Sequence, residues 1–164
     1  MNKGGGIFAD NDPQALLHDG IQAYQDGNLA EADATFRRVL KLDKNHADAN
    51  HLLGLVARQR GNNKVAVELI SRAIQINPDN AAYHNNLGNA MKDLHRIDEA
   101  VVSYRKAIAI LPSFSTAHSN LGSALRILGQ LQDGVTSIQM AIRLEPDMAS
   151  AHVNLGNIMK DMGR

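Results

Sequence analysis

The 164-residue chain contains no cysteine, so it has no disulfide framework, no thiolate metal site and no thiol nucleophile. It also has no excess charge, because 17 Lys and Arg residues balance 17 Asp and Glu residues. Such a balance argues against a general nucleic-acid-binding surface. No apolar run approaches the roughly 18 residues of a membrane-spanning helix, and the first residues lack the apolar stretch of a signal peptide. We therefore expect a soluble protein, most simply placed in the cytoplasm.

Aromatic residues are also scarce, at 4% of the chain, whereas alanine is abundant. A core without large rings has to be built by close approach of small and aliphatic side chains. Small side chains and few β-formers favour helix packed on helix. The composition therefore predicts an all-α fold.

The few prolines reveal an internal repeat. Three of the four, Pro78, Pro112 and Pro146, lie 34 residues apart. The same spacing relates four Leu-Gly pairs, which are Leu53–Gly54, Leu87–Gly88, Leu121–Gly122 and Leu155–Gly156. An earlier copy around Gly20 lacks the proline but keeps the apolar positions. A fixed period of this length is typical of a repeat protein.

The period divides the chain into a leader, four full repeats and half of a fifth repeat. Three glycines at 4–6 make the leader a flexible segment in this interpretation. The predicted segments are 1–12 for the leader, 13–46, 47–80, 81–114 and 115–148 for the full repeats, and 149–164 for the half repeat.

Within each repeat, the helical spacing of the apolar residues predicts two helices of about fourteen residues joined by a short turn. Gly27, Gly61 and Gly129 stand where the first helix must end and favour a left-handed cap, whereas His95 takes this position in the third repeat. The prolines close each second helix, since proline lacks the donor and clashes with the preceding turn. Asp12 before Pro13 is a typical helix start.

These positions resemble the tetratricopeptide repeat, a helix-turn-helix unit of 34 residues, over 152 of the 164 residues. The resemblance implies a solenoid, a right-handed superhelix of antiparallel helix pairs, with four full repeats plus one extra helix. Small residues such as Gly88 and Ala100 let the paired helices approach closely. It also implies that the first helices line a concave inner wall, which binds protein segments.

The positions that would face this wall carry amides and cations. Position six of the later repeats forms an amide column of Asn86, Asn120 and Asn154, and position nine holds Asn89, Ser123 and Asn157. Position twelve forms a basic row of Lys92, Arg126 and Lys160, which Arg58 precedes in the second repeat. We predict these nine wall residues as the peptide-binding site.

A side-chain amide offers both a donor and an acceptor, so it can hold one peptide group of an extended ligand without demanding a particular side chain. The basic row would select acidic flanks. The alternative is that these polar residues are merely tolerated on a solvated helix face. Asparagine is a mediocre helix former, so its recurrence at one position favours binding. For the basic row the solvated face is the better interpretation.

The sequence His-x-Asn-Leu-Gly occurs three times, starting at His84, His118 and His152. Neighbouring first helices are separated by on the order of 10 Å, whereas zinc needs each nitrogen at about 2 Å. One metal therefore cannot bind two of these histidines, and we expect them to pack between helices.

The same motif resembles the repeats of O-linked N-acetylglucosamine transferase and its SPINDLY-type relatives. That resemblance implies an asparagine ladder at Asn86, Asn120 and Asn154 that holds extended substrates, and a separate catalytic domain downstream. Leu52 and His18 occupy the position in the first two repeats, so the ladder begins in the third.

Another use of the fold, a clamp for chaperone C-terminal carboxylates, does not fit. Asn89 and Asn120 match it, but Asn85, Ser150 and Asn154 stand where its three cations should be. Without positive charge a dicarboxylate would be held poorly.

No catalytic, phosphate-binding or calcium-binding motif is present, so we predict a non-enzymatic protein-protein interaction module without a cofactor. Two alternatives stay open. The chain could be the substrate-recruiting part of a glycosyltransferase, or it could join copies of itself through its last helix. That helix keeps an apolar face of Leu155, Ile158, Met159 and Met162.

Overall fold

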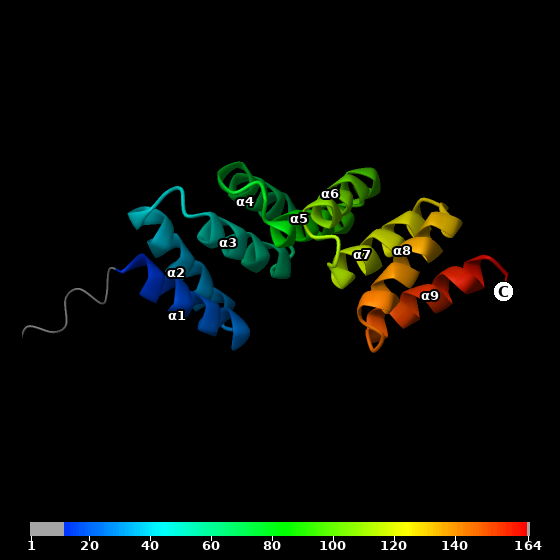
Figure 1. The fold of residues 1–164 in the computed structure, drawn as a ribbon. Coiled ribbons are helices and arrows are strands. Elements are labelled where there is room, and N and C mark those ends of the chain that lie inside the picture. Colours follow the sequence, from blue (N-terminus) through cyan, green and yellow to red (C-terminus); the bar gives the residue numbers. More distant parts are fainter. Residues whose placement is uncertain (1–11, 164) are drawn as a thin grey trace, which may run out of the picture. The chain divides into compact units, whose positions relative to one another are not determined.

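The computed structural model describes residues 12–163, which form α-helices and contain no strand (Figure 1). The leader predicted for 1–12 lies outside the described residues except for Asp12. The helices in chain order are α1 (Pro13–Gln25), α2 (Leu29–Leu42), α3 (Ala47–Gln59), α4 (Asn63–Ile76), α5 (Ala81–Asp93), α6 (Ile97–Ile110), α7 (Ser115–Ile127), α8 (Leu131–Leu144) and α9 (Ala149–Asp161).

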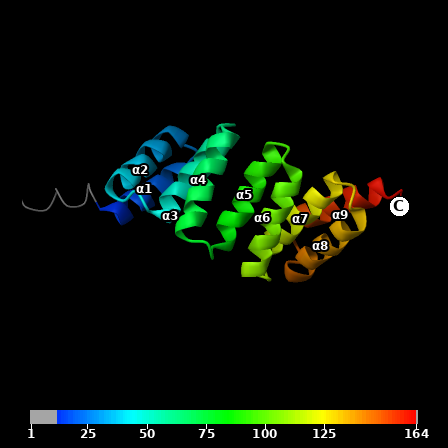
Figure 2. The same ribbon diagram turned by 90° about the horizontal axis from the view of Figure 1, so that it is seen from above.

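The helices belong to two compact units that divide between Pro78 and Asp79. The first unit holds α1 to α4 and the second holds α5 to α9. In both units, helices that follow one another in the chain pack side by side (Figure 2). The predicted all-α fold of stacked helix pairs is therefore confirmed.

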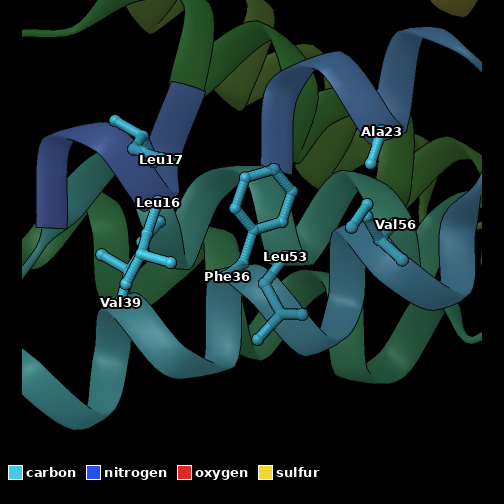
Figure 3. Close-up of a cluster of buried hydrophobic side chains, with 9 residues drawn as sticks. Leu16, Leu17, Ala23, Phe36, Val39, Leu53 and Val56 are labelled. Atoms are coloured by element: carbon cyan, nitrogen blue, oxygen red, sulfur yellow. The ribbon is translucent and has the colours of Figure 1, made fainter. Parts of the chain in front are cut away.

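In the first unit, α1 pairs with α2, α3 pairs with α4, and α3 also packs against α1 and α2. Figure 3 shows the core where the first three helices meet, with the ring of Phe36 among aliphatic side chains. A Cβ added to Gly20 would lie 2.5 Å from that ring. Glycine is therefore required on α1 for α2 to approach, as the repeat pattern predicts.

In the second unit, α5 pairs with α6 and α7 pairs with α8, while α9 packs against α8 and α7. The same glycine contact recurs, since a Cβ on Gly88 would lie 2.5 Å from the ring of Tyr104. Phe36 and Tyr104 are both fully buried. The repeat thus uses one packing rule, a first-helix glycine against a bulky second-helix side chain.

The helix ends follow the sequence prediction. Gly27, Gly61 and Gly129 have φ values of 77°, 78° and 74°, and His95 adopts the same left-handed conformation with a φ of 58°. The backbone N–H of Gln14 donates to the Asp12 carboxylate over 3.1 Å, which caps α1.

Between residues 12 and 163, the longest helices have 14 residues and none is both long and apolar enough to cross a membrane.

Candidate functional site

The first helices of the second unit, α5, α7 and α9, form a continuous wall. Helix α7 contacts both α5 and α9, whereas α6 and α8, which flank α7 on its other side, share at most marginal contact. A row of helices that is packed more closely on one side curves toward that side. The wall of α5, α7 and α9 is therefore the inner wall of this unit.

The amide column lies on this wall and is partly exposed. Two of its members bond to the preceding first helix. Nδ2 of Asn120 on α7 donates to Oδ1 of Asn85 on α5 over 2.9 Å, and Nδ2 of Asn154 on α9 donates to Oγ of Ser119 on α7 over 3.1 Å. The column therefore links the helices of the wall to one another.

Each of these bonds uses one of the two N–H groups of the amide. No other side-chain bond joins Asn120 or Asn154 to residues 12–163, so each keeps one N–H and its carbonyl oxygen. The amide plane is held by the neighbouring helix before any ligand arrives. A held donor and acceptor lose less conformational freedom on binding than a freely rotating amide does.

Asn86 and Asn89 are tied into α5 and its partner helix. Oδ1 of Asn86 accepts from Nδ2 of Asn85 and from Nδ2 of Asn89, both over 3.4 Å. Oδ1 of Asn89 accepts from the Tyr104 hydroxyl over 2.9 Å. The amide of Asn89 therefore joins α5 to α6, and its oxygen is already engaged.

The other two predicted residues at position nine are less constrained. Ser123 is partly buried on α7 and Asn157 is exposed on α9. Neither side chain bonds to another residue of the described chain. Both hydroxyl and amide are thus available at the edge of the column.

The basic row lies near the C-terminal ends of the same helices. Arg126 on α7 donates to Asp161 on α9 over 2.8 Å, and this ion pair joins the two helices. Lys92 is partly buried on α5, and Lys160 is exposed on α9. An exposed ion pair contributes about 0–1 kcal/mol, so the Arg126 pair stabilises the wall only slightly.

The residues that the sequence did not assign are the acceptors behind the amide column. Asn85 is 4% exposed and Ser119 is 2% exposed, although both are polar. Each lies 35 positions before the asparagine that it binds. That offset, one repeat plus one residue, is the signal by which the sequence could have revealed them.

The histidines of the His-x-Asn-Leu-Gly motif have a structural role in the second unit. Nε2 of His118 donates to the Pro112 carbonyl over 3.0 Å, and Nε2 of His152 donates to the Pro146 carbonyl over 2.7 Å. Each ring therefore fixes the loop that enters its helix. Within the described chain, no three His, Asp or Glu side chains are grouped so as to hold a metal ion.

Comparison with known proteins agrees with this architecture. Two family models, both described as tetratricopeptide repeat, match residues 20–81 and 81–114. No curated protein sequence matches the chain significantly.

Several solved structures share the fold. PilF from Pseudomonas aeruginosa aligns with a TM-score of 0.86 and 23% identity over 95% of this chain and 71% of its own. YrrB, described as a TPR protein with an unusual peptide-binding site, aligns with a TM-score of 0.76 and 19% identity over 94% of this chain and 79% of its own.

A mutant of the O-GlcNAc transferase from Thermobaculum terrenum aligns with a TM-score of 0.77 and 28% identity. The match covers 80% of this chain but only 26% of the transferase. With its recurring glycine contacts, its helix pairs and family matches that together span residues 20–114 of 164, the chain belongs to the tetratricopeptide repeat family.

Proposed function

We propose that the inner wall of α5, α7 and α9 binds an extended segment of a partner protein by its backbone. Tetratricopeptide repeats are a protein-protein interaction fold, and the repeats of this chain are of that kind. The observation that carries the proposal is the pair of amides at Asn120 and Asn154, which are held in place by bonds from one N–H each and keep an oxygen and a second N–H.

The oxygen of each held amide would accept from a backbone N–H of the ligand, and the remaining N–H would donate to a backbone carbonyl. Asn157 and Ser123 lie beside these residues as further donors. Lys160 is exposed without a partner within residues 12–163 and would favour an acidic flank of the ligand. Asn86, Asn89, Lys92 and Arg126 would contribute mainly by holding the wall in shape.

Peptides selected from a random library on the protein provide the probe for a test. We expect the variant with both Asn120→Ala and Asn154→Ala to bind such a peptide about ten-fold or more weakly in fluorescence polarisation, since each lost hydrogen bond is worth about 0.5–1.5 kcal/mol. The variant with Asn45→Ala and Asn77→Ala, both exposed and outside the helices of the wall, is the matched control.

The Asn120→Ala change also leaves Asn85 without its donor, so its effect on stability has to be separated from its effect on binding. Peptides with N-methylated backbone amides leave the protein unchanged and remove the N–H donors of the ligand, one position at a time. Backbone recognition requires that these peptides bind more weakly. Equal affinity for the methylated and unmethylated peptides would remove the proposal.

A second candidate function, self-association through α9, is favoured by a repeat position that no other helix of the described chain covers. A Cβ added to Gly156 would meet nothing within 4 Å, whereas the equivalent position Gly122 is covered by Ile138. Leu155 and Met159 on α9, and Met162 directly after it, are only partly buried. We propose light scattering over a concentration series as the test. A strict monomer at high concentration would contradict this function. So would a Met159→Asp variant that still associates to the same mass as the unmodified protein.

The similarity to the Thermobaculum terrenum enzyme supports a further possibility for a longer parent protein, that the repeats recruit substrates for a glycosyltransferase. The gene sequence beyond Arg164 tests it, since a nucleotide-sugar-binding domain would have to follow. The cytoplasmic location expected from the sequence stays a prediction.

A further inference from the structure

The first unit contains a cavity of about 370 Å³ on the side of the second helices. It lies between α2 and α4 and over α3. Its floor is apolar and is formed by Leu40, Leu53 and Leu69, of which Leu53 is 2% exposed and the others are partly buried. The cavity is at the lower end of the volume range that holds small ligands or a few side chains.

Four cations surround this floor, and we call the site the basic groove. They are Arg37 and Lys41 on α2, Lys44 in the following loop and Arg72 on α4. No acidic side chain of the described chain lines it. In a protein with 17 positive and 17 negative residues, this is a local segregation of charge.

Three of the four cations are unpaired. Arg37 donates to Asp33 over 2.7 Å, and this bond raises the pKa of the Arg37 guanidinium. Lys41, Lys44 and Arg72 have no hydrogen-bond or ion-pair partner among residues 12–163. The groove therefore presents three uncompensated positive charges around an apolar floor.

Helix stability explains only one of these charges. Lys41 lies in the last turn of α2, where a cation is favourable to the helix dipole. Lys44 lies beyond that helix, and Arg72 comes from α4, before its last turn. Their convergence on one cavity is not required by either helix.

The second unit supplies an internal comparison. The equivalent cavity between α6 and α8 has a volume of about 240 Å³, with Leu121 in the position of Leu53 and Arg105 in that of Arg37. At the positions of the three unpaired cations, the sequence there has Ala109, Pro112 and Met140. That cavity is still lined by two arginines, Arg105 and Arg143, but the repeat fold forms it without cations at these three positions. Lys41, Lys44 and Arg72 are therefore not required for the cavity to form.

We propose that the basic groove binds an acidic segment of a partner protein in which carboxylates flank a bulky aliphatic or aromatic residue. The apolar side chain would cover Leu40, Leu53 and Leu69, and the carboxylates would pair with Lys41, Lys44 and Arg72. The floor is recessed between two helices, which suits a protruding side chain and not the flat surface of a membrane. This site is on other helices than the amide column and is independent of it.

The probe for the test is a short synthetic peptide in which leucine alternates with glutamate, labelled with fluorescein. We expect the protein to bind it and binding to weaken as salt is raised. Replacing Lys41→Glu and Lys44→Glu together should weaken binding by about ten-fold or more, because attraction becomes repulsion. The matched control is Lys64→Glu with Lys106→Glu, which changes the net charge equally at exposed positions outside the groove.

Because Lys41→Glu also opposes the dipole of α2, the variant with Lys44→Gln and Arg72→Gln provides a second reading, with circular dichroism to show that both fold. A peptide with serine in place of leucine should bind more weakly to the unmodified protein.

The variant with Asn120→Ala and Asn154→Ala should bind the acidic peptide with unchanged affinity. The proposal for the basic groove is therefore tested independently of the proposal for the amide column. No binding of the acidic peptide, equal affinity for groove and control variants, or binding only to vesicles of anionic phospholipid would overturn the proposal.

Discussion

At the scale of single residues, His95 is the one non-glycine residue within 12–163 that adopts a left-handed backbone, with a φ of 58°. Gly27, Gly61 and Gly129 hold the equivalent position in the other repeats. A side chain with a Cβ is strained in this region by roughly 1–2 kcal/mol. The third repeat therefore has a less favourable helix end than its neighbours.

We expect His95→Gly to raise the free energy of unfolding by about 1 kcal/mol, because it removes this strain. Urea unfolding followed by circular dichroism measures the change. His95→Ala is the control and should bring no gain, since alanine keeps the Cβ. An equal gain in both variants would show that the imidazole, and not the backbone, is responsible.

His51 on α3 predicts a dependence of stability on pH. The residue is 8% exposed, and burial lowers its pKa from 6.5 to about 4, while the charge of Asp48 acts weakly in the other direction. Between these two values the unfolded chain binds a proton that the folded chain does not. Stability from His51 is thus present above about pH 6.5 and is lost as the pH falls toward about 4.

A pKa shift of this size corresponds to a decrease of roughly 3 kcal/mol in the free energy of unfolding at the acid end of this pH range. Urea unfolding at a series of pH values between these limits, for the unmodified protein and for His51→Gln, checks the prediction. The difference between the two proteins should narrow as the pH falls. A constant difference would show that His51 does not titrate on unfolding.

At the scale of helices, two glycines at the same repeat position predict opposite effects of one substitution. A Cβ on Gly122 would lie 2.8 Å from the backbone oxygen of Gly134 and would also meet Ile138, whereas a Cβ on Gly156 meets nothing within 4 Å. Overpacking costs about 1–3 kcal/mol, and alanine gains about 1 kcal/mol over glycine inside a helix.

We therefore expect Gly122→Ala to destabilise the protein by about 1–2 kcal/mol and Gly156→Ala to stabilise it by up to about 1 kcal/mol. Thermal and urea unfolding of both variants measure the effects. A loss of stability in Gly156→Ala would indicate that another helix already covers α9.

The helices themselves could be predicted from the sequence, but some of their polar contacts could not. The period places Gly88 against Tyr104 because the same packing has to recur in every repeat. The bond from Asn120 to Asn85 depends instead on which two side chains meet at one particular junction. Likewise, Lys41 and Arg72 come from different helices, and only the packing of α2 and α4 on α3 brings them to one cavity.

At the scale of the whole molecule, burial is uneven along the array. Helix α7 buries six of its residues, whereas α9 buries only Ala151 and Ile158. In a repeat protein each helix is stabilised by its neighbours, so a helix with fewer of them opens more easily. Local stability should therefore fall from α7 to α9.

Native-state hydrogen exchange measured by mass spectrometry checks this gradient. Amides of α9 should exchange faster than those of α7, and a dilution series should leave the difference unchanged in a monomer. If α9 becomes as protected as α7 at high concentration, the protein associates through this helix.

The bonds from His118 to Pro112 and from His152 to Pro146 bear on how these repeats can be exchanged between proteins. In each case the helix that follows the loop donates the hydrogen bond that holds the loop. A repeat transplanted from Ser115 onward would leave His118 without the carbonyl that it binds, whereas a repeat transplanted from Pro112 onward keeps this hydrogen bond. The portable module of this protein thus begins at the proline, ahead of the helix.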